Sequence, residues 1–353
     1  MKKILLLSDS FNGYGAENIM KWLGNNLGEH GFKVVFCSIF DREKSKDLTD
    51  RAEYYQMCFP KDVYDKNYFI NGVKFLRKIT KAEQYDFVIT FHTNPYLMAF
   101  FAKPFGKYKT LHSERDNPFN RDTFASHIKM WLYRFADKIV FQTEGAQQFF
   151  DKRTIQKSVI IPNPITVPTF QWRGRGKESI VSVGRLFIRY KRQDVLFEAF
   201  KDVLGSNPNY RLVLYGDGPD RGLLEKMASD MGISSNVDFK GKISNVSEHL
   251  ADEGIFVLTS DSEGMPNALM EAMALGMPVI STDCEPGGAR ALIDNGVNGI
   301  IVERSSVERL TEALKTLIND MQLQEEYGLN AREKMKQFSP ERIIIMWEIV
   351  LMN

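Results

Sequence analysis

The 353-residue sequence contains no apolar run long enough to form a transmembrane helix. Its first residues, MKKILLLSDS, turn polar after an apolar stretch that is too short for a signal peptide. Cysteine is scarce: Cys37, Cys58 and Cys284 share no spacing typical of a metal or redox site, and Cys37 and Cys284 adjoin apolar runs typical of a core. We therefore expect a cytoplasmic protein, with peripheral contact at the inner face of the cell membrane left open.

An excess of one charge is also absent, since 46 Lys and Arg residues stand against 45 Asp and Glu residues. This balance argues against nucleic acid as a partner. Residues 61–81 are nevertheless basic, and two interpretations remain: a solvated helix face, or a surface that meets an anionic membrane or a phosphate-bearing acceptor. The charged residues of this segment are Lys61, Lys66, Lys74, Arg77, Lys78 and Lys81, with Asp62 and Asp65.

Low-complexity tracts and short repeats are missing as well, and short apolar runs alternate with helix-length amphipathic segments along the chain. This alternation predicts parallel sheets covered by helices. The predicted strands are Lys3–Ser8, Phe32–Ile39, Asp86–Phe91, Lys109–His112, Lys138–Phe141, Val159–Ile161, Ser179–Val183, Arg211–Tyr215, Val237–Phe239, Ile255–Thr259, Pro278–Ser281 and Gly299–Val302.

A polar passage rich in proline and glycine, residues 162–176, divides these strands into two groups and is typical of a linker. A chain of this length also favours two domains. We therefore predict an α/β protein of two Rossmann-like, doubly wound parallel-sheet domains facing a central cleft. The domains cover residues 1–165 and 177–338, and a final helix runs from Pro340 to Leu351.

Open parallel sheets bind ligands at the carboxyl ends of their strands, and in the second domain those loops carry suitable residues. Gly184 and Arg185 leave the first strand and Lys191 follows, so that a guanidinium and an ammonium could hold a diphosphate. A surface ion pair explains the same residues equally well. The next loop contains Gly216 and Gly218, which suit either close backbone approach to a ligand or a tight turn.

The most informative segment is residues 260–274, where a strand gives way to a helix. Backbone N–H groups at the start of that helix would attract an anion. Glu263 precedes the helix, and Glu271 lies inside it at a spacing that returns its carboxylate to the ligand's side, where it could accept from the hydroxyls of a ribose. A capping acid and a solvated glutamate are the alternative. The residues at the helix start are Gly264, Met265, Pro266, Asn267 and Ala268.

EGMPNALMEAMALGMPVI resembles the nucleotide-binding motif of retaining glycosyltransferases of family 4. VGRLFIRYKRQDVLFEAF, YGDGPDRGLLEKMASDMGI and IPNPI are similar to other family motifs in the same order, and GYGAENIM resembles the family's Gly-Gly-Ala-Glu loop. The resemblance implies the GT-B fold, with an acceptor-binding first domain, a donor-binding second domain and a final helix, residues 340–353, that crosses back onto the first domain. EGMPNALMEAMALGMPVI occupies residues 263–280 and VGRLFIRYKRQDVLFEAF residues 183–200. YGDGPDRGLLEKMASDMGI occupies residues 215–233, IPNPI residues 161–165 and GYGAENIM residues 13–20.

The resemblance also implies a role for each matching residue of the donor site. Arg185 and Lys191 would hold the donor diphosphate, Glu271 the ribose and Glu263 the transferred sugar. The backbone of the helix-start residues would meet the phosphate or the sugar. Backbone N–H groups of Gly15 and Ala16 would approach the diphosphate from the first domain. Two positions depart from the family pattern there: Tyr14 stands for a glycine and Asn18 for an arginine.

The loop TLHSERDNPFN, residues 110–120, is similar to a Ser-Glu-Arg loop of capsule- and glycan-building family members. His112, Glu114 and Arg115 of this loop are candidate catalytic residues. Glu263 of the second domain is the fourth candidate catalytic residue. Each of the three could contact the acceptor or sugar hydroxyls, or could instead cap the next helix. His92, which follows another predicted strand, is a further candidate.

The implied reaction is retaining transfer from a nucleotide sugar, UDP-hexose or UDP-N-acetylhexosamine, to a glycan or a lipid-linked saccharide. The resemblance implies that neither a metal nor a cofactor is needed, because helix dipoles and basic side chains neutralise the leaving diphosphate. Consistently, no Asp-x-Asp follows a strand, and Asp283-Cys284-Glu285 is the nearest approach to one. Three alternatives remain: a sugar-nucleotide epimerase on the same fold, a noncatalytic partner subunit, and a dinucleotide site at Gly13 and Gly15. In the last, Asn18 replaces the third glycine.

Overall fold

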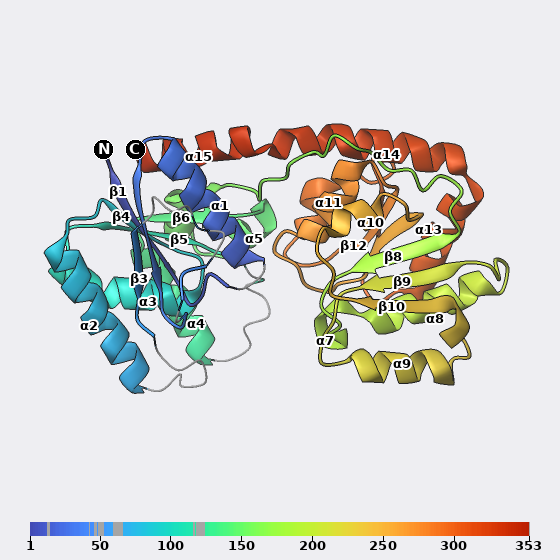
Figure 1. The fold of residues 1–353 in the computed structure, drawn as a ribbon, viewed down its shortest axis with the longest axis horizontal. Helices are drawn as coiled ribbons and strands as arrows, with labels where there is room; N and C mark the ends of the chain where they lie inside the picture. The colour runs from blue at the N-terminus through green and yellow to red at the C-terminus, as the bar shows by residue number, and fades with distance from the viewer. Residues whose placement is uncertain are drawn as a thin grey trace. The chain divides into compact units, whose positions relative to one another are not determined.

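The computed structural model describes residues 1–12, 15–41, 43–45, 48, 53–58, 66–115, 117 and 124–352. The chain forms two compact units (Figure 1). Met1–Asn163 and Glu341–Asn353 make the first unit, and Pro164–Pro340 make the second. The second unit is therefore one continuous segment, whereas the first is assembled from both ends of the chain.

The first unit is built on a seven-stranded parallel sheet with the order β3-β2-β1-β4-β5-β6-β7. Residues Ile4–Leu7 of β1 are fully buried, as expected for a strand that has helices on both faces. β3 was not predicted, and its sequence EYYQ lacks the apolar run of the other strands. The strands are β1 (Lys3–Ser8), β2 (Lys33–Ser38), β3 (Glu53–Gln56), β4 (Phe87–Thr90), β5 (Lys109–Ser113), β6 (Lys138–Phe141) and β7 (Ser158–Ile160).

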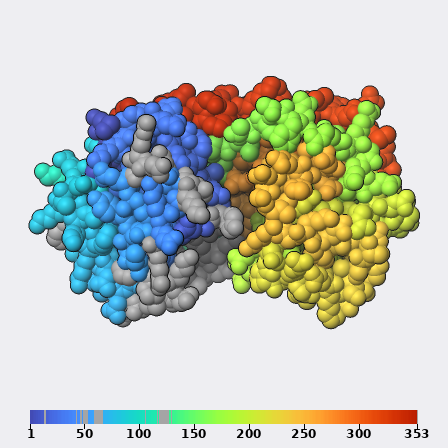
Figure 2. Space-filling model, viewed as in Figure 1, coloured from blue at the N-terminus to red at the C-terminus, as the bar shows by residue number. Residues whose placement is uncertain are grey.

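The helices of the first unit include the last helix of the chain, α15, whose Trp347 is fully buried and stacks on Phe91 with ring centroids 6.1 Å apart. Figure 2 shows red atoms of this helix lying against blue atoms of the first unit. The helices are α1 (Ala16–Glu29), α2 (Lys66–Ala82), α3 (Thr93–Ala102), η1 (Lys103–Phe105), α4 (Phe124–Trp131), η3 (Leu132–Phe135), α5 (Glu144–Gln148), α6 (Lys152–Gln156) and α15 (Pro340–Met352).

The second unit contains a six-stranded parallel sheet with the order β10-β9-β8-β11-β12-β13. Successive residues of β8 point to opposite faces of this sheet, where Ile180 and Val181 enter separate apolar cores. The strands are β8 (Ser179–Val183), β9 (Arg211–Tyr215), β10 (Val237–Gly241), β11 (Ile255–Leu258), β12 (Val279–Thr282) and β13 (Ile300–Val302). The helices are α7 (Ile188–Lys191), α8 (Gln193–Leu204), α9 (Arg221–Asp230), η4 (Ser234–Asn236), α10 (Val246–Leu250), α11 (Asn267–Leu275), α12 (Gly288–Leu292), α13 (Val307–Asn319), α14 (Met321–Met335) and η5 (Lys336–Phe338).

Both sheets confirm the predicted doubly wound α/β architecture. Cys37 and Cys284 are buried free thiols, as predicted, and Cys58 is exposed. Within the part of the chain that the structure describes, no helix combines the length and the apolar character needed to cross a bilayer.

Candidate functional site

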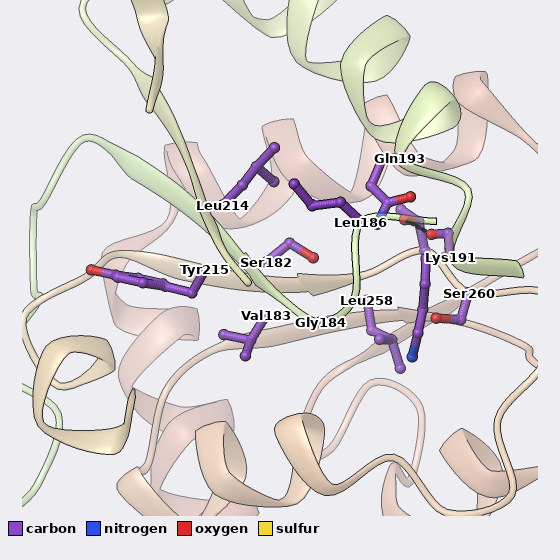
Figure 3. A pocket seen from close by; sticks show the side chains of 11 residues that line it. Ser182, Val183, Gly184, Leu186, Lys191, Gln193, Leu214, Tyr215, Leu258 and Ser260 are labelled. Carbon is purple, nitrogen blue, oxygen red and sulfur yellow. Dashed lines mark hydrogen bonds between the residues drawn. The ribbon is translucent and has the colours of Figure 1, made fainter. Parts of the chain in front are cut away.

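The candidate site lies where the strand order of the second sheet reverses, at β8 between β9 and β11. Loops that leave neighbouring strands in opposite directions open a crevice at such a point. A small cavity occurs there (Figure 3). Its lining includes Gly184 after β8, Tyr215 at the end of β9, Thr259 and Ser260 after β11, and Lys191 from α7. The cavity thus gathers residues from three strand ends.

Lys191 and Glu263 form an ion pair at this crevice. The Ser260 hydroxyl donates to the same Glu263 oxygen, Oε1, at 2.8 Å, and the Thr259 hydroxyl donates to the Lys191 carbonyl at 2.8 Å. Figure 3 shows the Lys191 side chain running down beside Ser260. The protein therefore fixes the positions of both charged groups, and the sequence motif gave no sign of this network.

Arg185 differs from Lys191 in having no acidic partner. Its side chain is exposed, and its Cζ lies 5.7 Å from the centroid of the Phe187 ring. Among the residues the structure describes, none forms an ion pair with Arg185. The guanidinium charge is therefore free to meet an anionic ligand, whereas the Lys191 charge is already compensated.

Gly216 and Gly218 are explained by contacts between two loops. A Cβ on Gly216, whose φ is +127°, would lie 1.9 Å from the Gly184 carbonyl oxygen, and a Cβ on Gly218 would lie 2.2 Å from the Leu186 carbonyl oxygen. The Gly216 N–H donates to the Gly241 carbonyl, and the Gly218 N–H donates to the Asp217 carboxylate. These two glycines therefore shape the loop, and their own N–H groups are already used.

Helix α11 begins at the edge of the crevice without a side-chain cap on its N-terminus. The first backbone N–H groups of a helix have no partner within it and carry partial positive charge. The loop before α11 is fixed by the segment that follows β12, because the Glu263 N–H donates to the Glu285 carbonyl at 2.8 Å. A Cβ on Gly288 would lie only 2.6 Å from the Gly264 carbonyl oxygen. The site thus combines an uncapped helix start with a braced loop before it.

The predicted helix-start residues stand as expected around this point. Met265 and Pro266 are buried, and α11 starts at Asn267, so that Asn267 and Ala268 form its first turn. The amides of this turn and the Glu263 carboxylate belong to one short segment that follows β11.

Glu271 is a half-buried carboxyl group in the second turn of α11. Burial raises its pKa to about 7. None of the described residues offers it an ion-pair or hydrogen-bond partner. Burying a carboxylate without a partner costs stability, and such groups cluster at functional sites. Glu271 is therefore a candidate ligand-binding group on structural grounds alone.

Of the predicted loop of the first unit, the structure describes residues 110–115 and 117, and most of these are buried. The His112 and Glu114 side chains are buried, with Nε2 of His112 3.9 Å from Oε2 of Glu114 and Nδ1 of His112 3.1 Å from the Thr90 hydroxyl. Arg115 donates to Asn163 Oδ1 at 2.6 Å, and burial lowers its pKa to about 9. The His112 side chain is therefore enclosed by its neighbours in this structure.

Reasoning from the sequence found His92 but missed the two carboxylates beside it, Asp9 and Glu17, at the reversal point of the first sheet between β1 and β4. His92 Nδ1 lies 3.9 Å from Oδ2 of Asp9, and His92 Nε2 lies 3.8 Å from Oε1 of Glu17. Burial raises the pKa of Asp9, although His92 opposes this shift. The available signal was that Asp9 directly follows β1 and His92 closely follows β4.

Gly15 and Ala16 open helix α1, and Gly15 is the residue before it with φ of +68°, a conformation that favours glycine. The two preceding residues of that motif, Gly13 and Tyr14, lie outside the described residues. Gly15, Ala16, His92 and the loop of His112 belong to the first unit, and the other predicted site residues belong to the second.

No group of three or more His, Cys, Asp or Glu side chains within the described ranges has an arrangement that could hold a metal ion. In the Asp283-Cys284-Glu285 segment, Asp283 pairs with Arg290 and Glu285 pairs with Arg304. The carboxylates that most resembled a metal site in the sequence are therefore engaged by arginines.

Residues 171–334, which cover the switch point, the uncapped helix and both glutamates, match the family model of glycosyl transferases group 1. The matched segment lies within the second unit and identifies it as a group 1 glycosyltransferase domain. The chain is 26% identical to an uncharacterized glycosyltransferase of Haemophilus influenzae over 99% of this chain and 100% of that protein. It is 25% identical to the amylovoran biosynthesis glycosyltransferase AmsD of Erwinia amylovora, over 65% of this chain and 67% of AmsD.

The fold of the glycosyltransferase is also that of solved structures. The Anabaena HepE structure, in complex with UDP-glucose, superposes with a TM-score of 0.84 and 18% identity, covering 100% of both chains. At this identity the likeness shows the fold alone, and it confirms the predicted GT-B type.

Proposed function

We propose that this glycosyltransferase transfers a sugar, with retention of anomeric configuration, from a UDP-hexose or UDP-N-acetylhexosamine to a saccharide acceptor in surface-polysaccharide biosynthesis. The observation that carries the proposal is the crevice at β8, where an uncapped helix start, two basic side chains and two glutamates lie in the loops and helices that follow the strands at one sheet edge. The UDP-glucose complex of HepE and the amylovoran role of AmsD support the donor and the pathway class.

The donor diphosphate is proposed to lie between Arg185, Lys191 and the first turn of α11. Arg185 offers a fork of donors and Lys191 a point charge, and the amides of Asn267 and Ala268 add partial positive charge. As the sugar–phosphate bond breaks, negative charge grows on the diphosphate, so these groups stabilise the transition state more than the bound donor. Gly15 and Ala16 are proposed to add backbone N–H groups from the first unit.

The two glutamates are proposed to hold the neutral parts of the donor. Glu271 would accept from the two ribose hydroxyls, a use that fits a half-buried carboxyl group without a partner. Glu263 would bind hydroxyls of the transferred sugar, and Ser260 holds its carboxylate in place. Glu263 is then close to the anomeric carbon, where positive charge develops during transfer.

The acceptor is proposed to be a glycan or a lipid-linked saccharide held by the first unit. The polar group of Asp9, Glu17 and His92 offers hydrogen-bonding partners for sugar hydroxyls at the reversal point of that sheet. The loop of His112, Glu114 and Arg115 follows the neighbouring strand β5. Buried free thiols at Cys37 and Cys284 fit a reducing compartment, and we place the reaction in the cytoplasm, with capsule among the candidate products.

The proposed donor class predicts selective thermal stabilisation by UDP-sugars. The melting temperature should rise with UDP and further with one UDP-hexose or UDP-N-acetylhexosamine, because ligands that bind only the folded state stabilise it. The measurement is a thermal-shift panel against UDP-, GDP-, ADP- and TDP-sugars, followed by UDP release with saccharide acceptors. A purine nucleotide sugar that stabilises the protein more than any UDP-sugar would contradict the donor assignment.

Chelation of metal ions is predicted to leave turnover unchanged. The diphosphate charge is assigned here to Arg185, Lys191 and the start of α11, which need no divalent ion. Initial rates are compared with and without EDTA, and then after addition of Mg²⁺ or Mn²⁺. A rate lost in EDTA and restored by either ion rejects the metal-independent mechanism.

A further inference from the structure

The first unit exposes large apolar side chains on the helices α2, α3, α4 and η3, which contain none of the donor motifs. Phe101 is 45% exposed, Trp131 49% and Phe135 47%, and Ile70 and Ile128 are about equally exposed. Among the residues that the structure describes, Phe101, Trp131 and Phe135 are the exposed large aromatic side chains. We call the five residues the aromatic patch.

Ring contacts join the patch across several helices, which lie next to one another in Figure 1. Phe101 of α3 contacts Phe69 of α2 at 5.8 Å between ring centroids. Phe100 contacts Phe135 of η3 at 5.9 Å, and Phe135 contacts Trp131 of α4 at 5.2 Å. Phe100 also contacts Phe101, at 5.1 Å, so the three exposed aromatic side chains belong to one run of ring contacts on the first unit.

The elements that carry the patch contain no acidic residue. Lys74, Lys78 and Lys81 on the outer face of α2 are exposed, and none of them forms an ion pair with a described residue. Arg134 lies over Trp131, with its Cζ 4.8 Å from the ring. Basic side chains thus border the apolar surface. In α2, α3, η1, α4 and η3 together the charged residues are Lys66, Lys74, Arg77, Lys78, Lys81, Lys103, Lys129 and Arg134.

We propose that the aromatic patch docks on an anionic lipid surface, with Phe101, Trp131 and Phe135 inserted at the headgroup level and the lysines of α2 over the headgroups. Trp and Phe side chains beside Lys and Arg are the composition that binds the membrane interface. Anionic headgroups complement the three exposed lysines of α2, which have no ion-pair partner among the described residues, whereas Arg134 is already ion-paired with Asp151.

A second copy of the chain is a poorer occupant of the same surface. A self-complementary dimer would place the basic side chains of one copy against those of the other, and like charges in contact oppose association. A soluble phosphate polymer would be attracted by the lysines, but it would leave the aromatic side chains in water. The lipid surface accounts for both the apolar and the basic groups.

The test is sedimentation of the intact protein with vesicles, without donor or acceptor, so that its outcome is independent of the sugar chemistry. Vesicles containing phosphatidylglycerol should bind the protein, and phosphatidylcholine alone should bind it at least about tenfold more weakly, because each lysine near the surface adds attraction. Binding should fall as salt rises. Brominated lipid chains should quench fluorescence in the wild-type protein but much less in Trp131→Phe.

The variants separate insertion from charge alone. Phe101→Ser/Trp131→Ser/Phe135→Ser should lose binding by about tenfold or more, and Lys74→Glu/Lys78→Glu/Lys81→Glu should lose it too. The matched control, Leu223→Ser/Met321→Ser/Leu329→Ser, removes equally exposed apolar side chains of the second unit and should bind like the wild type. Unchanged binding by the aromatic variant, equal binding to both vesicle types, or a dimer that dissociates in that variant each overturns the proposal.

Discussion

Glu263→Ala is expected to lower kcat by about tenfold or more while UDP still binds. Glu263 is proposed to contact the sugar that becomes positively charged during transfer, so its contribution grows in the transition state. Hydrogen bonds to a charged group contribute roughly 1.5–3 kcal/mol each. The substitution also removes the partner of Lys191, which then becomes free for the diphosphate. UDP affinity should therefore stay the same or increase.

Steady-state kinetics and calorimetric UDP binding test this expectation together. Glu198→Gln is a suitable control, because Glu198 is exposed on α8 and lies outside the proposed site. The melting temperature of Glu263→Ala is compared with that of the wild type, to detect any loss of structure. A variant that loses UDP binding but keeps kcat would show that Glu263 serves the nucleotide and not the sugar.

Glu271→Gln is expected to weaken UDP binding and raise the donor KM by about tenfold or more, with a small change in kcat. The amide of Gln offers one neutral accepting oxygen where the carboxylate offers two charged ones, and the loss of hydrogen bonds to a charged group has this size. Because the ribose takes no part in bond breaking, ground and transition states should be weakened alike. A fall in kcat with an unchanged donor KM would contradict the assignment.

The same variant should be more stable than the wild type at alkaline pH. Burial raises the pKa of Glu271 from 4.5 to about 7, so the protonated carboxyl stabilises the fold below about pH 4.5 and this contribution is lost as the pH rises through 7. The gain from Glu271→Gln should thus grow between pH 4.5 and 7 and level off above it. Its upper limit is about 3 kcal/mol, from about 1.36 kcal/mol per pH unit.

Urea unfolding of ligand-free wild type and Glu271→Gln at pH 5 and pH 8 measures this difference. A difference that is the same at both pH values would show that Glu271 is ionised throughout. For the wild type, UDP affinity should fall as the pH drops below 7, because ribose hydroxyls bind the carboxylate form. In Glu271→Gln that pH dependence should be reduced.

The sequence predicted the fold well because most strands are short apolar runs, and the central strands such as β1, β4 and β11 are buried on both faces. β1, β6, β8 and β9 begin and end at the predicted residues. β3 escaped prediction because it is a half-buried edge strand whose sequence, EYYQ, has no apolar run. Its position depends on pairing with β2, which the local sequence does not encode.

Within the site, the sequence predicted the residue types but not their interactions. The Lys191–Glu263 pair joins positions 72 residues apart, and its geometry depends on how two loops meet. Gly216 and Gly218 were ambiguous because a glycine needed for loop contact and one needed for ligand contact look the same in sequence. The sequence did not predict the aromatic patch either, because residue type alone does not tell which aromatic side chain is exposed. Phe100 and Phe101 are adjacent, yet only Phe101 is exposed.

The return of α15 to the first unit has a consequence for the order of events during synthesis. The second unit is complete once residue 340 has left the ribosome, whereas the first unit still lacks Ile343, Trp347 and Leu351 of its core. Phe91 lacks its stacking partner until Trp347, which follows the whole second unit, has been synthesised. Of the two units, the one whose synthesis begins first is therefore completed last, and until then its incomplete apolar core is exposed and can be bound by chaperones.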